Sequence, residues 1–361
     1  MRSAVEHRMD GLLWSAVRND RALVDKSAAT ELGERSLQTR SHHRALWGTL
    51  LELTSELDRI GIEIATFKGV TAEARWYDAA GERPCADLDL LVAPQHHDRV
   101  GDLVAAVDPN HPLAADVASL VAKGALQSIE LQRNGISIDV HLDLFKLGIP
   151  SRQRDEIWTR TEIFSSPHGD VRVLDAETAL VHLLLHLNKD RFRRLLGYVD
   201  VVHLIEREQV DWHAVAAIAA ADGLGALTAL SLDCVSGDLG RPRFPLPEAR
   251  GWKAKAWQRL WPPRVRLQGD LAVVGFHLRQ AFLPALADGR TSDAVRLAAR
   301  RLLPDPALVR FRNAGVRGGY VRRLTLGRVE RTRARRRAMR QLRQDASPRL
   351  DQATASNREA G

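Results

Sequence analysis

The feature that most constrains the fold is a β-hairpin near the middle of the chain. Two stretches of alternating polar and apolar residues, 128–133 and 136–142, flank Asn134-Gly135. Asn-Gly between alternating segments is the strongest short-range signal for a two-residue turn, because both positions tolerate positive φ. Together with shorter strand-like stretches before it, this hairpin predicts a small mixed or antiparallel sheet.

Segments before the hairpin alternate between strand-like and helical periodicity, and the pattern becomes helical after residue 173. Strand-like stretches at 62–67 and 86–92 are each followed by a helical segment, and longer helical patterns cover 6–58 and 177–206. These patterns predict an α/β (α+β) fold, with a small mixed sheet flanked by helices and a helical C-terminal half. The predicted parts are an N-terminal helical segment 1–60, an α/β core 61–173, a helical domain 174–320 and an Arg-rich, partly disordered tail 321–361.

Composition excludes several classes of protein. Of 361 residues, 45% are hydrophobic and 27% charged, which is the balance of a globular chain. Cys85 and Cys234 are too few for a disulfide framework or a cysteine-rich zinc module, and neither has a neighbour that suggests thiol catalysis. The first residues lack the apolar core of a secretion signal, and no apolar run approaches the ~18–20 residues of a transmembrane segment. We therefore expect a cytoplasmic protein.

Positive charge is concentrated at the C-terminus. Residues 291–361 contain 18 Arg, no Lys and six acidic residues, whereas the preceding residues carry a small negative net charge. The formal net charge of +8 is therefore a property of the tail. Such a tail could bind a polyanionic partner, such as RNA, an acidic protein or a membrane surface, or it could be a solvated helix.

Two aspartates share one face of the predicted strand 86–92. Alternation places Asp87 and Asp89 together and the intervening leucines on the opposite face. Neighbouring carboxylates repel each other, so such a pair needs a cation or strong donors. Mg²⁺ binds through carboxylates together with phosphates and water, which makes it the cation that fits. By itself the pattern also fits a solvated strand face.

A third aspartate lies on the second strand of the hairpin. Asp139 shares its face with His141, and it reaches the other two aspartates if the hairpin pairs beside their strand. Three clustered carboxylates are the arrangement that a two-metal site requires. The sequence therefore indicates a candidate metal site at Asp87, Asp89 and Asp139.

A lysine and a glycine stand where the first predicted strand meets the following helix. Glycine at such a junction lets backbone N–H groups of the helix N-terminus approach a phosphate, and a lysine adds a positive charge. Lys68 and Gly69 are therefore candidate phosphate-binding residues. Many strand–helix junctions use glycine only to turn.

The combination of these motifs resembles a known family. The segments are Phe67-Lys-Gly-Val70, Arg83-Pro-Cys-Ala-Asp-Leu-Asp-Leu-Leu-Val92 and Ile138-Asp-Val-His141, followed by His182-Leu-Leu-Leu-His186 and Lys189-Asp-Arg-Phe-Arg193. Together they resemble the nucleotidyltransferase superfamily that includes polymerase β, and more closely a bacterial family of uncharacterised nucleotidyltransferases. The resemblance covers roughly residues 46–326, and its most specific part is 67–92.

The resemblance implies a magnesium-dependent transfer of a nucleotidyl group. An acceptor hydroxyl would attack the α-phosphorus of a nucleoside triphosphate and pyrophosphate would leave, with two Mg²⁺ ions offsetting the charge that develops. Asp87 and Asp89 would be metal ligands, and Asp139 would hold the catalytic metal or help to deprotonate the hydroxyl. Lys68 and Gly69 would face the triphosphate. The superfamily has Gly-Ser at this junction, whereas Val70 follows the glycine here, so Lys68 could replace the serine.

Further basic residues are open to two interpretations. Arg83 could contact phosphate, or it could form an ion pair with Glu82 or another carboxylate. Lys189, Arg191 and Arg193 could face the nucleotide from the helical half, or they could be solvated. Of these, Arg83, Lys189 and Arg193 are the candidate nucleotide-binding residues.

Three histidines are also candidates. His141 and His186 could position the metal-binding side chains without binding the metal themselves. His182 and His186 lie four residues apart on an apolar helix, a spacing that zinc ligands can have. The zinc-protease motif is absent, so core or substrate-facing positions fit these two histidines better.

The sequence leaves several functions open. The first is a magnesium-dependent nucleotidyltransferase whose acceptor is a metabolite, a peptide or protein, or RNA. The basic tail favours a large or polyanionic acceptor, so an RNA-modifying, toxin-like transferase is the nearest alternative. A non-catalytic nucleotide-binding scaffold is a second alternative, although three clustered carboxylates argue against it. A simple RNA-binding module ranks last, because aromatic residues are only 5% and no aromatic RNA-recognition motif is present.

Overall fold

The computed structural model describes residues 2–20, 23–111, 117, 119–121, 126–145 and 151–246, together with positions 255, 257–259, 266–267, 306 and 308–309. The chain divides into two compact units, Met1–Leu302 and Leu303–Gly361. Only three described positions belong to the second unit. The helices and strands given below therefore all belong to the first unit.

The first unit combines helices with a single sheet. Its described helices are α1 (Arg2–Glu6), α2 (Asp10–Val17), α3 (Lys26–Arg59), α4 (Gly69–Trp76), the 3₁₀ helix η2 (Pro94–Arg99), α5 (Val100–Val107), α7 (Arg154–Thr159), α8 (Ala176–Lys189), α9 (Leu195–Arg207), α10 (Trp212–Ala221) and α11 (Gly225–Leu239). Its described strands are β1 (Ile64–Thr66), β2 (Asp87–Val92), β3 (Ser128–Arg133), β4 (Ile136–His141), β5 (Glu162–Ser166) and β6 (Gly169–Val173).

The sheet has six strands in the order β3-β4-β2-β1-β6-β5. β2 lies near its centre, antiparallel to β1 and parallel to β4. β1 also pairs in parallel with β6, and the hairpins β3–β4 and β5–β6 form the two edges. The predicted mixed sheet flanked by helices is therefore confirmed.

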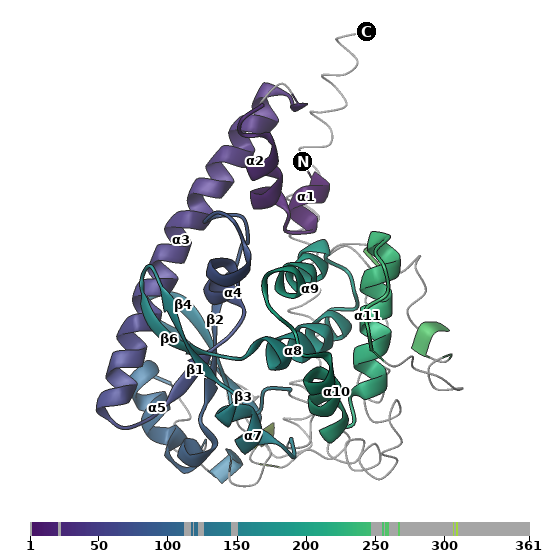
Figure 1. Ribbon diagram of the computed structural model, residues 1–361. Helices are drawn as coiled ribbons and strands as arrows, with labels where there is room; N and C mark the ends of the chain where they lie inside the picture. Colours follow the sequence, from purple (N-terminus) through teal and green to yellow (C-terminus); the bar gives the residue numbers. More distant parts are fainter. Residues whose placement is uncertain are drawn as a thin grey trace. The chain divides into compact units, whose positions relative to one another are not determined.

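Different helices cover the two faces of the sheet (Figure 1). Leu91 belongs, with Phe67, to the hydrophobic core that also contains the apolar side chains of α8, α9, α10 and α11. α3 runs along the other side of the sheet, where it contacts β2 and β6. Asp89 shares a strand face with Leu91, because alternate residues of a strand point the same way. Asp89 therefore lies on the face that α8 covers.

The predicted hairpin is present at the predicted residues. Asn134 and Gly135 have φ of 52° and 78°, the positive values that a two-residue turn between antiparallel strands requires. The second hairpin, β5–β6, is missing from the sequence prediction. Its first strand is mostly exposed, with Ile163 57% accessible, so the alternation that reveals a half-buried strand is weak there.

Two helices predicted as continuous are interrupted. The pattern over 6–58 is divided among α1, α2 and α3, and α3 begins after Asp25, whose side chain accepts a hydrogen bond from the N–H of Ala28. The pattern over 177–206 is divided between α8 and α9. Arg191 and Phe192 have φ of 63° and 54°, and left-handed residues end an α-helix. Burial of the Phe192 side chain holds this turn in place.

The Arg-rich tail 321–361 lies outside the described residues, so its predicted helix and its predicted disorder stay predictions. The division of the chain into four parts also stays a prediction. Among the helices that the structure describes, each is too short or too polar to cross a lipid bilayer.

Candidate functional site

Parallel pairing of β2 with β4 brings two of the predicted aspartates side by side. Asp89 lies opposite Asp139 in the register, and Leu91 lies opposite His141. Partners in neighbouring strands point to the same side of a sheet. Asp89, Asp139 and His141 therefore share the face that α8 covers.

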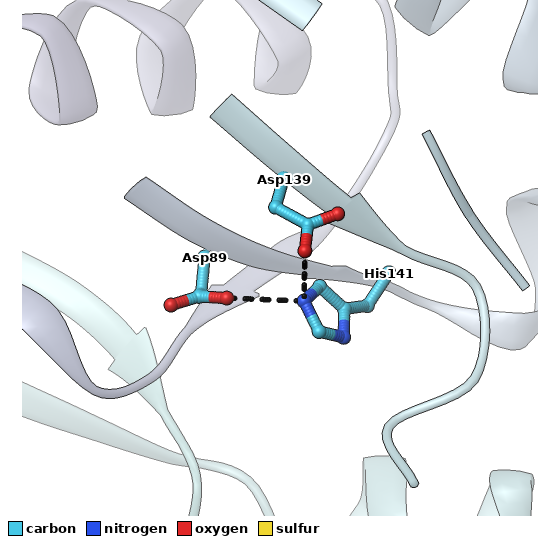
Figure 2. A group of neighbouring side chains, drawn as sticks. All are labelled: Asp89, Asp139 and His141. Carbon is cyan, nitrogen blue, oxygen red and sulfur yellow. Dashed lines mark hydrogen bonds and ion pairs between the residues drawn. The ribbon is translucent and has the colours of Figure 1, made fainter. Parts of the chain in front are cut away.

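The imidazole of His141 joins the two carboxylates (Figure 2). Its Nε2 atom lies 3.1 Å from Oδ1 of Asp89 and 3.3 Å from Oδ2 of Asp139. One ligand atom of each residue lies within 4.8 Å of the other two, so the three side chains could hold a metal ion. The His141 and Asp89 side chains are buried, whereas that of Asp139 is 31% exposed. The group is therefore open to solvent at Asp139.

Lys68 places a positive charge against the most deeply buried carboxylate. Its Nζ atom lies 3.2 Å from Oδ1 of Asp89. Burial alone would favour the protonated carboxyl group, but the Lys68 charge and the hydrogen bond from His141 hold the pKa of Asp89 well below its usual value. Asp89 is therefore ionised at neutral pH, which is the form that binds a cation.

The junction between β1 and α4 has an unusual backbone. Lys68, the N-cap residue of α4, has a φ of 59°, and Gly69 has a φ of 49°. Positive φ is unfavourable for a residue with a side chain, so Lys68 is strained. A Cβ atom on Gly69 would meet the carbonyl oxygen of Asp87 at 3.4 Å, an ordinary contact, so it is the positive φ and not a lack of space that favours glycine there. The backbone is therefore strained at this junction, and the same conformation places the ammonium group of Lys68 next to the carboxylate of Asp89.

Asp87 lies apart from the group of three. It is the first residue of β2, it pairs with Ser137, and it is exposed. Loss of part of its surrounding water and the negative charge of Asp89 raise its pKa. The structure thus brings Asp89 and Asp139 together with His141, and leaves Asp87 on the same strand face at the exposed end of β2.

Arg83 is held in a buried ion pair. Its Nε and Nη2 atoms donate to the two carboxylate oxygens of Asp200, each at 2.8 Å, and its Nη1 donates to the carbonyl oxygen of Gly69 at 3.2 Å. The hydroxyl of Tyr77 donates to the same carboxylate at 2.6 Å. Of the two roles considered for Arg83, the ion pair with a carboxylate is confirmed. Its contact with phosphate stays a prediction.

The histidines of α8 face the group from the helical side. His182 packs edge-on against Phe67, with ring centroids 5.0 Å apart, and His186 lies one turn further along the helix. Burial and the charge of Lys68 lower the pKa of both imidazoles, well below the usual value for His182 and to about 4 for His186. Both rings are therefore neutral at physiological pH.

The predicted basic residues of the helical half follow these histidines. Lys189 is the last residue of α8 and is exposed. Arg193 lies in the turn before α9, where its Nε donates to the carbonyl oxygen of Asp190. Their contact with a nucleotide stays a prediction.

Three residues beside the site form contacts that the sequence does not predict. Nδ1 of His43 lies 2.5 Å from Oε2 of Glu73, and its Nε2 lies 3.1 Å from Sγ of Cys85. The other oxygen of Glu73 accepts hydrogen bonds from the N–H groups of Gly81 and Arg83. These contacts tie the turn before β2 to α3 and α4. No local pattern signals them, because the partners lie far apart in sequence and on different elements.

Comparison with known proteins places the chain in a family. A family model described as uncharacterised nucleotidyltransferase matches residues 1–237. The chain belongs to this uncharacterised nucleotidyltransferase family. Among curated proteins, no relative matches the chain.

A solved structure also matches this member of the uncharacterised nucleotidyltransferase family. It is an antigenic nucleotidyltransferase-like protein from Paracoccidioides brasiliensis, 14% identical, and the match covers 52% of this chain and 85% of that one with a TM-score of 0.35. At this TM-score the likeness does not establish a shared arrangement of elements.

Proposed function

We propose that the chain is a magnesium-dependent nucleotidyltransferase of the polymerase-β-like superfamily. The oxygen of an acceptor hydroxyl would bond to the α-phosphorus of a nucleoside triphosphate, the bond to the α–β bridging oxygen would break, and pyrophosphate would leave. One observation carries the proposal: Asp89, Asp139 and His141 converge beside Lys68 in a member of a nucleotidyltransferase family.

The donor set fits a divalent cation. Asp89 is ionised, and Asp139 adds carboxylate oxygens of the kind that Mg²⁺ prefers. His141 would either supply a nitrogen ligand or hold the two carboxylates in place. When bound, Mg²⁺ would offset the negative charge that develops on the phosphates. A second ion would need Asp87 as a further ligand.

The residues of this chain would position the reactants. Lys68 and the first N–H groups of α4, which have no partner within the helix, would bind the triphosphate. Lys189 and Arg193 would approach the nucleotide from the helical side. Asp139, which is partly exposed, would accept the proton of the attacking hydroxyl or hold the metal that lowers its pKa. Catalysis would then come mainly from positioning and electrostatics.

The acceptor is proposed only as a class. It would be a hydroxyl of a metabolite, of a peptide or protein, or of RNA. The 18 Arg within residues 291–361 favour a polyanionic acceptor, because a cluster of like charge attracts the opposite charge. An RNA-modifying transferase is therefore the more specific form of the proposal.

Label transfer from nucleoside triphosphates tests the proposal. The purified protein is incubated with Mg²⁺, cell extract and each α-³²P-labelled triphosphate in turn, and the labelled products are separated. We expect transfer by the wild type and none above background with Asp89→Asn, which removes the charge of the buried carboxylate and keeps its size.

An exposed aspartate provides a matched control. Asp102 lies on α5, is exposed and forms an ion pair with Arg99, so Asp102→Asn removes the same charge away from the site. We expect this variant to transfer label like the wild type. The extract should contain all three acceptor classes: metabolites, proteins and RNA. If the wild type and both variants then bind nucleotide but transfer no label, the result would favour the non-catalytic scaffold.

A further inference from the structure

One histidine of α8 is buried without a hydrogen bond. His182 is 6% exposed, and neither ring nitrogen has a partner among the residues that the structure describes. His43 is also buried, but both of its ring nitrogens have partners, Glu73 and Cys85. A buried polar group without a partner destabilises a fold, so the presence of His182 needs a reason other than packing.

The position of His182 places it at the candidate site. Its ring packs edge-on against Phe67, and the centroid of the His141 ring lies 6.4 Å away. Lys68 approaches the same phenyl ring, with Nζ 5.2 Å from its centroid. His182 and Lys68 thus contact one ring, His182 from α8 and Lys68 from the junction between β1 and α4.

Side chains that carry nitrogen form a row on this side of α8. His182, His186 and Lys189 are spaced by four and three residues, so they share one side of the helix. An imidazole ring has at least one N–H that can donate a hydrogen bond, whatever its protonation state. Several donors and a lysine fit an anion rich in acceptor oxygens, such as a triphosphate.

We propose that His182 donates a hydrogen bond to the triphosphate chain of the nucleotide, together with Lys68. This assignment rests on the proposed function and adds to it a phosphate-binding residue from the helical part of the chain. A bound phosphate would accept the hydrogen bond for which no described residue provides an acceptor. A histidine needed only for packing would have its hydrogen bonds satisfied within the fold, as His43 has.

Two leucine variants separate a binding role from a packing role. His182→Leu replaces an unpartnered polar ring by an apolar side chain of similar volume, so we expect the Tm of the unliganded protein to rise by about 2 °C or more. His43→Leu leaves Glu73 and Cys85 without their partner, so we expect its Tm to fall. Differential scanning calorimetry of the full-length proteins measures both shifts.

Calorimetric titration with tripolyphosphate in the presence of Mg²⁺ measures the contact itself. Tripolyphosphate has the phosphate chain and lacks the nucleoside. We expect His182→Leu to bind it about tenfold more weakly than the wild type, or weaker still, because a hydrogen bond to a charged oxygen is lost. His182→Gln keeps an N–H donor, so it should retain more affinity than His182→Leu.

Three results would overturn the assignment. If His182→Leu lowers Tm as His43→Leu does and leaves tripolyphosphate affinity unchanged, His182 is a packing residue and the proposed function stands without it. If His182→Leu weakens binding of ATP and not of tripolyphosphate, the contact is to the nucleoside. If the wild type binds neither tripolyphosphate nor any of the four nucleoside triphosphates, this assignment and the proposed function both fail.

Discussion

At the scale of single residues, the candidate site depends on one ammonium group placed against one buried carboxylate. Lys68 offsets the charge of Asp89 at 3.2 Å, and it does so from a strained backbone position. Such strain persists where the surrounding structure enforces it, and it concentrates at functional sites. A cation bound at Asp89 would take over the neutralising role and leave Lys68 available to phosphate.

Replacing Lys68 by methionine tests this pair. Lys68→Met keeps most of the length of the side chain and removes its charge. We expect the free energy of unfolding to fall by about 2 kcal/mol at pH 7, because Asp89 stays buried without its counter-charge. Urea unfolding of the two proteins measures the difference.

The difference in free energy of unfolding between the wild type and Lys68→Met should become smaller as the pH falls. The pKa of Asp89 is lowered in the folded protein, so its carboxylate contributes stability above the pKa of an unfolded aspartate, about 4. That contribution is lost as the pH falls through the lower pKa of the folded state. We therefore expect the full difference between about pH 5 and 7 and a smaller one near pH 3. An equal difference at every pH would contradict the pairing of Lys68 with Asp89.

At the scale of elements, the start of β2 is fixed by contacts from three helices. Glu73 of α4, with His43 of α3, holds the turn that precedes the strand, and Asp200 of α9 holds Arg83. Arg83 also donates to the carbonyl oxygen of Gly69, so it links this turn to the Lys68 junction. The position of the candidate metal ligands is therefore set by the helical part of the chain as well as by the sheet.

A double-mutant cycle tests the Arg83–Asp200 link. Arg83→Met leaves Asp200 buried without its counter-charge, and we expect a loss of about 3 kcal/mol in the free energy of unfolding. Asp200→Asn keeps an acceptor for the Tyr77 hydroxyl and removes the charge. The double variant should be more stable than the sum of the two single losses predicts, as measured by urea unfolding. Additive losses would mean that the two residues do not act as a pair.

Local patterns predict the elements that carry the site, and long-range contacts complete it. Alternation and the Asn-Gly turn are enough to place Asp87, Asp89 and Asp139 on their strands, because strand periodicity is a local property. The pairing of β2 with β4 depends on strand order, which no local pattern reveals. For the same reason the turn at 190–194, set by burial of Phe192, and the contacts of His43 could not be read from the sequence.

At the scale of the whole molecule, the main feature is the uneven distribution of charge. Twelve of the 18 C-terminal Arg lie within residues 321–361, and the residues before 291 carry a small negative net charge. Charge of one sign concentrated at one end of a chain affects partners and association rates more than it affects the fold. In the proposed function, the tail would therefore help to select the acceptor.

Ending the chain after residue 320 tests the role of the tail. If RNA is the acceptor, we expect the full chain to bind labelled RNA with an affinity that falls steeply, by about 10³-fold or more, between 50 and 200 mM salt. The shortened chain should lose most of this binding and keep Mg²⁺-dependent nucleotide binding. RNA binding that survives the truncation with the same salt dependence would exclude the tail as the polyanion-binding segment.

The position of the transferred label distinguishes transfer of a nucleotidyl group from transfer of a terminal phosphate. The wild type, Mg²⁺ and cell extract are incubated with the same triphosphate labelled with ³²P either at the α- or at the γ-phosphorus. We expect only the α-label to enter the acceptor, the γ-label to be released in pyrophosphate, and Asp89→Asn to abolish both. Transfer of the γ-label to the acceptor would show a phosphoryl transferase instead, and α-label transfer that survives Asp89→Asn would exclude a metal site that depends on Asp89.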